Sequence, residues 1–286
     1  MESAKHPAAA STPPSQAVLG LGRTAEVMAV GNDRIKKRFR SSFPHHAIRA
    51  EFAASDWVYR QGLSVPRVFE LLEEEAGLSI VFQRIQGPTL MKRLLLPGFQ
   101  KRGARLLASL HAEIHRIPTD ESAPFRSMKL ALTSSIREAP ILTETEKERI
   151  IRYTEVLPEE TRLCHGDFHP DNVLLGKQPV IIDWATAVSG SPAGDAARTV
   201  LMLQYGSLPD KTPQWINVIV GLVRKRLTRT YLEQYLKLSG LSRRELEQWM
   251  LPVAAARLIE WLPTQEKTQL AGLVRTRLKE LEAAGG

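Results

Sequence analysis

Apolar and polar positions alternate in short runs along the first third of the chain. Five runs have the period of β-strands: residues 17–20, 25–30, 34–40, 65–71 and 78–82. The turn-forming cluster Gly31-Asn32-Asp33 is typical of a hairpin. Residues 46–61 instead have apolar positions at helical spacing and end before Gly62. We therefore predict a small, mostly antiparallel sheet with one helix over residues 17–86.

The pattern changes after Gly87-Pro88. Apolar residues then recur at helical spacing, as in residues 100–117, and two capping boxes open helices at Thr143 and Ser242. The chain is therefore predicted to be α+β and bilobal, with a larger, mostly helical part over residues 87–286. Residues 1–16 are rich in Ala, Ser and Pro and have little to bury, so we expect a flexible tail there.

A polar island lies within the helical part, at residues 163–184. It contains HGDFHPDN (165–172), and an apolar run, VIID, follows and ends in Asp183. Burying such a cluster without a function would be costly. We expect Asp167, Asn172 and Asp183 to converge where two strand ends meet. Asn172 and Asp183 would then offer the oxygen ligands that magnesium prefers, and Asp167 would be a base or positioning group. Alternatively, these residues only form and cap turns.

This arrangement resembles the protein-kinase catalytic segment, in which an Asp precedes an Asn by five positions and a metal-binding Asp follows a short hairpin. Gly166 stands where those kinases have Arg. HGDFHPDN followed by IDW resembles the aminoglycoside phosphotransferase and choline kinase-like families, over residues 17–270. The resemblance implies a bilobal protein-kinase-like fold that binds ATP with Mg²⁺. It also implies transfer of the γ-phosphate to a hydroxyl of an aminoglycoside-, choline- or sugar-like small molecule.

The small lobe should then hold the nucleotide. GLGRTAEV (20–27) resembles a Gly-rich phosphate loop, although Ala25 replaces the third glycine and a bare GxG is also typical of a plain turn. The segment 83–85 resembles the hinge after the last strand of a nucleotide lobe, where backbone groups would bind adenine. The resemblance implies nucleotide contacts at Gly20, Gly22, Thr24, Gln83 and Ile85.

Lys37 is the expected partner of the ATP phosphates. In the predicted strand it shares a face with Ile35 and Phe39, so its charge requires an anion. Glu51 lies on the apolar stripe of the next helix and is the expected partner in a kinase-type Lys–Glu pair. A nucleic-acid-binding patch or a solvated edge strand would also explain the basic residues of this strand. A one-residue shift in register would select Lys36 instead.

Four other residues are candidates for chemistry or for core packing. His111 and His115 are four apart on one helix and could bind a metal, but we expect them to form the rim of a packed helix. Asp195 precedes a helical sequence and predicts an N-cap, while in the resembled families an Asp here braces the catalytic segment. Cys164 follows an apolar residue, and we expect it to pack in the core rather than act as a nucleophile.

Composition narrows the class of protein without choosing a ligand. The chain has 286 residues, 43% hydrophobic and 24% charged, which is typical of globular proteins and excludes collagen, coiled coil and disorder throughout. The net charge of +8 would suit nucleic acid, anionic lipid or a phosphorylated ligand. The charge does not choose among these ligands, but we expect no nucleic-acid partner. The single cysteine excludes a disulfide framework and a four-cysteine zinc site. Without an apolar run of about 18 residues or a signal-peptide core at the start, we expect a cytoplasmic protein with no membrane segment.

Two alternatives to a phosphotransferase stay open. A metal-dependent hydrolase could use the cluster of His165, Asp167 and His169, but it would leave Lys37 and Glu51 without a purpose. A catalytically silent nucleotide-binding module would be expected to have lost a site residue, and none of the expected set is missing.

The acceptor molecule is harder to predict. Residues 199–286 contain 13 basic and 8 acidic residues, which argues against a polycationic antibiotic. Arg257 and Glu260 are candidates for contact with the acceptor. Four tryptophans could bind a quaternary ammonium group, but we expect them to serve ordinary helix packing instead. They are Trp184, Trp215, Trp249 and Trp261.

Overall fold

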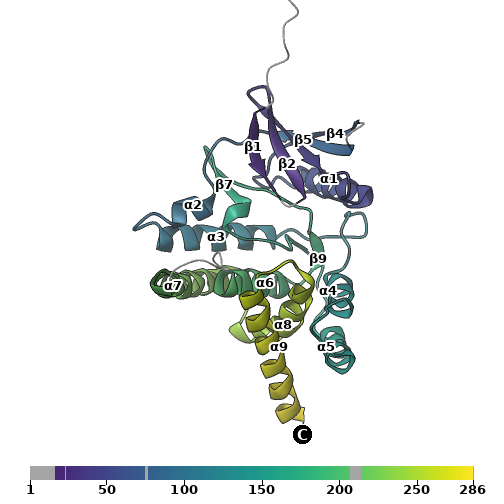
Figure 1. Cartoon of the computed structure of the whole chain (residues 1–286), viewed down its shortest axis with the longest axis vertical. Coiled ribbons are helices and arrows are strands. Elements are labelled where there is room, and N and C mark those ends of the chain that lie inside the picture. Colours follow the sequence, from purple (N-terminus) through teal and green to yellow (C-terminus); the bar gives the residue numbers. More distant parts are fainter. Residues whose placement is uncertain (1–16, 23, 75–76, 207–213, 286) are drawn as a thin grey trace, which may run out of the picture.

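The computed structural model describes residues 17–22, 24–74, 77–206 and 214–285, with backbone alone for 214–220 and 284–285. Figure 1 shows the strands of the first part of the chain gathered at one end, above a larger helical part. This is the predicted α+β bilobal, protein-kinase-like arrangement. The predicted tail over residues 1–16 lies outside the described residues.

The N-terminal lobe contains the predicted antiparallel sheet, and its five strands lie in the order β1-β2-β3-β5-β4. One helix, α1 (His45–Arg60), covers it and contributes Ile48 to a small core with Phe39 and Ile80. The apolar face of each strand drives this packing, because burying alternate residues places every second side chain against the helix. The strands are β1 (Val18–Leu21), β2 (Ala25–Val30), β3 (Arg34–Phe39), β4 (Val68–Glu74) and β5 (Gly77–Gln83).

The fourth strand begins and ends three residues later than the pattern predicted. The backbone N–H of Val65 donates to Leu63 in a turn, and Pro66 has no N–H to donate to a neighbouring strand. The strand instead runs on through Glu73 and Glu74, which pair with β5. These acidic residues looked like loop sequence because apolar alternation stops before them.

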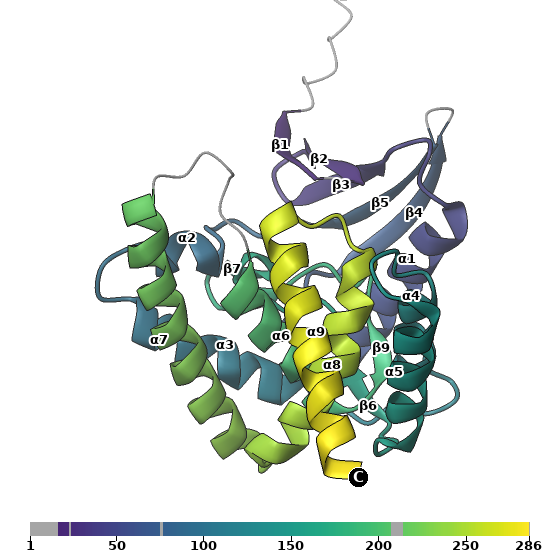
Figure 2. The same cartoon turned by 60° about the horizontal axis from the view of Figure 1, so that its bottom comes forward.

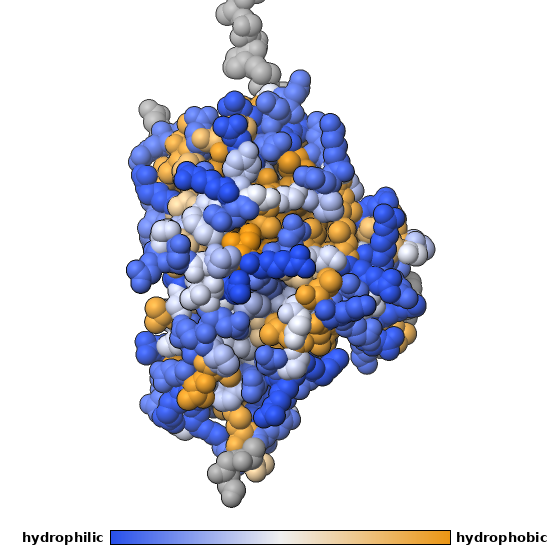
Figure 3. All heavy atoms as spheres, turned by 180° about the vertical axis from the view of Figure 1, so that it is seen from behind, coloured by the Kyte–Doolittle hydropathy of each residue, from blue (hydrophilic) through white to orange (hydrophobic). Residues whose placement is uncertain are grey.

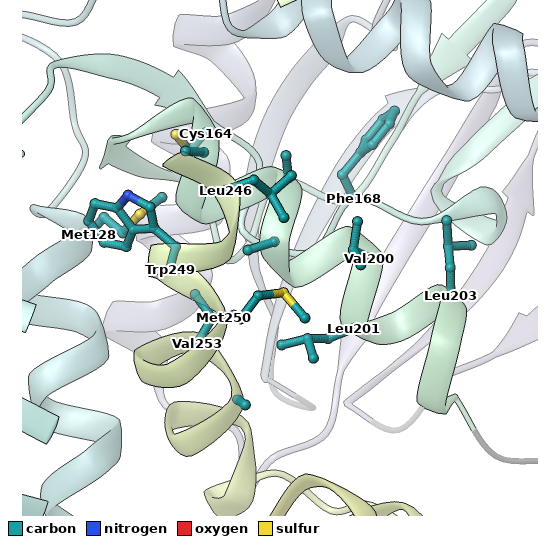
Figure 4. Packing of buried hydrophobic residues seen from close by; sticks show 14 of the residues in the cluster. Met128, Cys164, Phe168, Val200, Leu201, Leu203, Leu246, Trp249, Met250 and Val253 are labelled. Atoms are coloured by element: carbon teal, nitrogen blue, oxygen red, sulfur yellow. The ribbon is translucent and has the colours of Figure 1, made fainter. Parts of the chain in front are cut away.

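The core of the helical lobe includes the facing sides of α6 and α8, where Figure 4 shows Met250 pointing toward Leu201 and the Trp249 ring pointing toward Met128. Both predicted capping boxes are present, at the start of α5 and of α8. Helices α2, α4, α7 and α9 were not predicted, and α6 begins at Pro192, before the expected cap at Asp195. The helices are α2 (Leu90–Leu94), α3 (Gln100–Ile114), α4 (Met128–Arg137), α5 (Glu144–Val156), α6 (Pro192–Tyr205), α7 (Gln214–Ser239), α8 (Arg243–Ala256) and α9 (Thr264–Gly285).

Two short two-stranded sheets carry the polar island within the helical lobe. One pairs β6 (Arg162–Cys164) with β9 (Val188–Gly190), and the other pairs β7 (Val173–Leu175) with β8 (Pro179–Ile181). The apolar run expected to end in Asp183 therefore leaves the sheet two residues earlier.

The connection between the lobes packs directly on the β7–β8 hairpin. Gly87 has φ 155°, and a Cβ added there would lie 2.1 Å from the Leu175 carbonyl oxygen, so only glycine fits. The Leu175 N–H donates to the Pro88 carbonyl at 2.9 Å. Gly87 and Pro88 thus pack the connection between the lobes against β7 of the polar island.

Polar and charged side chains cover most of the back face, and hydrophobic atoms form smaller groups between them (Figure 3). Within the described part of the chain, no helix is long and apolar enough to cross a membrane.

Candidate active site

Hydrogen bonds join the two halves of the polar island. The His165 ring donates from Nε2 to the Ile182 carbonyl at 3.0 Å and accepts from the Asp167 N–H at Nδ1 at 3.3 Å. The Asn172 side-chain amide donates to the Asp167 carbonyl at 2.9 Å, and the Ile182 N–H donates to the Asn172 carbonyl at 3.0 Å. The structure therefore brings Asp167, Asn172 and the segment leading to Asp183 into one region.

Gly166 explains why this segment departs from the kinase pattern. Its φ is 75°, and a Cβ there would lie only 2.0 Å from the Thr186 carbonyl oxygen. An arginine, or any other side chain, cannot take this place without moving the backbone. Asp183 also has a positive φ, 68°, which Asp tolerates better than most residues.

Asp195 anchors the start of the polar island from below. Its carboxylate accepts the N–H groups of His165 at 2.6 Å and Gly166 at 3.0 Å, and the Nε2 groups of His111 and His115 at 3.1 and 3.2 Å. Burial opposes its charge, but these donors outweigh burial and hold its pKa well below the usual value. The predicted N-cap role is wrong because Ser191 occupies the cap position of α6. The bracing role is the one observed.

His111 and His115 are core residues and do not form a helix rim, which corrects the prediction. Each bonds to a tyrosine hydroxyl through Nδ1, His111 to Tyr231 at 2.6 Å and His115 to Tyr235 at 2.7 Å. Burial lowers the pKa of His111 to about 3, so this ring is neutral. The two histidines are four residues apart on one helix, and the two tyrosines are four apart on another. This matching spacing was the sequence signal for the contact.

Lys37 forms ion pairs with carboxylates of both lobes. Its Nζ lies 2.6 Å from Glu51 Oε1 on α1 and 3.1 Å from Asp183 Oδ1. Burial opposes the charge of Lys37, but the two carboxylates outweigh it and raise the pKa of the amine. Burial raises the pKa of Glu51, and Lys37 partly offsets this. The predicted Lys37–Glu51 ion pair is present, and Asp183 joins it from the other lobe.

The opposite face of β3 has its own carboxylates. Arg34 lies 4.0 Å from Glu70, and Arg38 lies 2.6 Å from Glu26. Lys36 lies 3.0 Å from Glu74 on this same face, so it does not replace Lys37. Since β3 is also an inner strand of the sheet, the alternative of a solvated edge strand is not supported.

The glycine segment forms a tight turn between β1 and β2. The Gly22 N–H donates to the Ala25 carbonyl at 2.8 Å, and Gly20 lies in β1 beside Val27. Thr24 is exposed next to this turn. At the other end of the sheet, the N–H groups of Gln83 and Arg84 already donate to Arg67 and Asp33. Adenine contacts expected at 83–85 would therefore have to use other backbone groups than these two.

Arg198 is a residue of the site that the sequence analysis missed. Its guanidinium lies 3.2 Å from Asp167 Oδ1 and 2.6 Å from Glu260 Oε1, so it links the polar island to the segment after α8. His169 Nε2 lies 3.4 Å from the other oxygen of Asp167. Burial opposes ionisation of Asp167, but His169 and Arg198 outweigh it and hold the pKa well below the usual value. The only sequence signal for this role was that Arg198 lies among small and apolar residues of α6.

The donor atoms around Asn172 and Asp183 fit a hard cation. The side-chain nitrogen of Asn172 is committed to Asp167, which leaves its oxygen as the acceptor. Asp183 gives one oxygen to Lys37, and its side chain is 45% exposed. Amide and carboxylate oxygens are the ligands that Mg²⁺ prefers.

Comparison with known proteins identifies the family. The model of the Phosphotransferase enzyme family (APH) matches residues 17–249. The chain belongs to this family. An aminoglycoside 3'-phosphotransferase of Streptomyces fradiae is 25% identical over 135 residues, which cover 42% of this chain and 50% of the relative. The match thus spans about half the length of that relative.

Two solved structures of phosphotransferases have the same fold. An aminoglycoside-3'-phosphotransferase of type VIII has a TM-score of 0.60 and 20% identity, with 84% of this chain and 93% of that one covered. The aminoglycoside phosphotransferase APH(3'')-Id of Streptomyces rimosus, in complex with ADP and streptomycin, has a TM-score of 0.57 and 17% identity, with 82% and 90% covered. The phosphotransferase family therefore accounts for both lobes.

The hydrolase alternative is not favoured for this family member. Both ring nitrogens of His165 are already engaged with Ile182 and Asp167. Among the described residues, the three that place ligand atoms within 4.8 Å of one another are His111, His115 and Asp195, not the predicted cluster. Those three are buried and bonded to one another and to the backbone.

The remaining candidates are Cys164 and the four tryptophans. Cys164 is fully buried, and burial and Asp195 raise the pKa of its thiol well above the usual value, which fits the packing interpretation. Trp184 and Trp249 are buried in the core, whereas Trp261 is 89% exposed. The side chain of Trp215 lies outside the described residues.

Proposed function

We propose that this chain is an ATP-dependent phosphotransferase that moves the γ-phosphate to a hydroxyl of a small molecule. The observation that carries the proposal is the Lys37 centre, where one amine lies within 3.1 Å of carboxylates from both lobes. The catalytic-type segment with Asp167 and Asn172 is bonded to the same region. Residues 17–86 would bind the nucleotide, and residues 87–286 would carry the catalytic segment and the acceptor site.

We place the nucleotide between the lobes, with Lys37 at its phosphates. Glu51 would hold the amine in position, as in other kinase-type Lys–Glu pairs. The complex of a protein of the same fold with ADP supports a bound nucleotide. Further contacts are proposed at Gly20, Gly22, Thr24, Gln83 and Ile85.

Asn172 and Asp183 would hold Mg²⁺. When bound, the ion would neutralise the phosphate charge that develops during transfer. The protein contributes the two oxygen donors and keeps Asp183 in place through Lys37.

Asp167 would position the acceptor hydroxyl. Its low pKa makes it a weak base, which favours orienting the hydroxyl over removing its proton early in the reaction. Arg198 and His169 each bond one of its oxygens and so restrict the direction in which the carboxylate points.

An ATP-consumption screen against hydroxyl-bearing small molecules, with and without Mg²⁺, tests this function. We expect at least one aminoglycoside-, amino-alcohol- or sugar-like compound to stimulate turnover. Asp167→Asn should then lower turnover by about 10²-fold or more, because it removes a positioned acid–base group. ATP affinity, measured by calorimetry, should stay within a few-fold, since Lys37, Asn172 and Asp183 are retained.

Two outcomes would contradict the proposal. ATP binding without turnover on any compound would favour a silent nucleotide-binding module. Stoichiometric zinc in the wild type, lost in Asp167→Asn and detected by mass spectrometry, would favour the hydrolase if neither protein binds ATP.

A further inference from the structure

Asp167 is the first member of a chain of alternating charges that leads away from the polar island. Arg198 bridges Asp167 and Glu260, and Arg257 bridges Glu260 at 3.3 Å and Glu266 at 2.9 Å. We call these five residues the Asp167 charge chain. Both oxygens of Glu260 are bonded to arginines, one each to Arg198 and Arg257. The oxygens of Asp167 are shared between Arg198 and His169.

Two buried donors of the arginines in this chain have no acceptor among the described residues. They are Arg198 Nε and Arg257 Nη1. Arg257 is 3% exposed, so its charge stays largely away from water. A buried donor without an acceptor lowers stability. The arginines therefore hold the carboxylate oxygens that they already contact. A cationic ligand would therefore have to compete with two arginines for Asp167 and Glu260.

The accessible end of the chain is where an acceptor must approach Asp167. The side chains of Asp167, Glu260 and Arg198 are 33%, 28% and 20% exposed. Trp261 follows Glu260 and is 89% exposed. Figure 2 shows that the connection between α8 and α9 lies at the end of these helices nearer the strands. A hydroxyl that reaches Asp167 therefore lies close to Arg198, which is 3.2 Å from this carboxylate and 2.6 Å from Glu260.

We propose that Arg198 determines acceptor specificity by occupying the carboxylates that a polycation would need, so that the acceptor is a neutral, hydroxyl-rich molecule. This inference rests on the proposed phosphotransferase function. An ammonium group gains little at Asp167 or Glu260 while Arg198 and Arg257 are bound there, and it is repelled by both guanidinium groups. A neutral hydroxyl needs only one lone pair of Asp167 and displaces neither arginine.

Calorimetry with kanamycin, an aminoglycoside with several amino groups, tests the inference without nucleotide. We expect weak binding to the wild type. Arg198→Gln releases one oxygen of Asp167 and one of Glu260, so the affinity for kanamycin should rise roughly tenfold or more, the value of one charge-assisted hydrogen bond. Arg152→Gln is the matched control, because it removes the same charge from an exposed i,i+4 pair with Glu148 on α5. It should leave kanamycin affinity unchanged.

Equal gains in Arg198→Gln and Arg152→Gln would overturn the inference, since net charge alone would then explain them. It would also be overturned if wild-type protein bound kanamycin as tightly as Arg198→Gln. A thermal-shift response to Mg²⁺–ATP verifies that Arg198→Gln is folded. If that variant does not fold, Arg198→Lys is tested instead. A lysine ammonium cannot bond both carboxylates at once, so kanamycin affinity should still rise, but less than in Arg198→Gln. A wild-type protein that does not respond to Mg²⁺–ATP contradicts the proposed function, whereas the kanamycin affinities test Arg198 alone.

Discussion

Asp195 and Lys37 each bind several partners of opposite charge or polarity, and the two sites differ in what surrounds them. The Asp195 side chain is fully buried, and its four donors all belong to the helical lobe. The Lys37 side chain is 16% exposed, and its two carboxylates come from different lobes, with Asp183 45% exposed. One site is closed around a carboxylate, and the other is an open centre around an amine.

The difference shows what each site can do. Four donors satisfy Asp195 and hold the backbone of His165 and Gly166, so this site fixes the polar island and leaves no oxygen for a ligand. Lys37 with Glu51 and Asp183 has one more negative than positive charge, and one of the carboxylates faces solvent. Under the proposed function, this excess negative charge would attract Mg²⁺, and Lys37 would contact a phosphate of the nucleotide.

The largest expected effect comes from breaking the open centre at Asp183. Asp183→Ala should abolish the magnesium-dependent thermal shift with ATP and lower turnover by roughly 10³-fold, because it removes an oxygen ligand from a charge-stabilising site. Asp183→Asn is the matched control, since Asn also tolerates the positive φ of this position. A loss in both variants assigns the effect to the carboxylate. A magnesium response of wild-type size in Asp183→Ala would show that Asp183 is not a ligand.

The next effect sharpens the role of the Lys37–Glu51 pair in stability. Lys37→Met leaves the buried carboxyl of Glu51 without its cation and should lower the free energy of unfolding by about 3 kcal/mol. Lys37→Met/Glu51→Gln removes the buried charge and should recover most of that loss, yet it should not restore turnover. Urea unfolding measures both variants. A double variant as unstable as the single one would mean that the pair contributes through packing rather than charge.

The smallest expected effect is on the pH dependence of stability, and it tests the closed site around Asp195. The pKa of His111 is about 3 in the folded protein, below its ordinary value of about 6.5, so its contribution to stability is complete above pH ~6.5 and is lost as pH falls toward 3. Between pH 6 and 5 this amounts to at most ~1.4 kcal/mol per pH unit. His111→Gln should flatten the decline by that amount in urea unfolding. His46→Gln removes an exposed histidine on α1 and should keep the wild-type slope. An unchanged slope in His111→Gln would contradict a neutral buried ring.

Much of the site could be predicted because its parts are local in the chain. HGDFHPDN places Asp167 and Asn172 five residues apart, and the alternation in residues 34–39 places Lys37 on the opposite face from Arg34, Lys36 and Arg38. The predicted ends of β4 and the predicted N-cap of α6 were wrong. The polar residues at these places are positioned by contacts with residues distant in the sequence. Glu74 lies in a strand because it pairs with β5 and bonds Lys36, not because of its own propensity.

The amino-acid sequence by itself determined the strand and helix periods, the glycines at strained positions and the polar island, since each depends on residues a few positions apart. Only the tertiary structure decided which charges meet. Lys37 reaches Asp183 across 146 residues, His111 reaches Tyr231 across 120, and Arg198 reaches Glu260 across 62. Those contacts depend on how helices and sheet pack, because the period of a single element says which face is buried but not what lies against it.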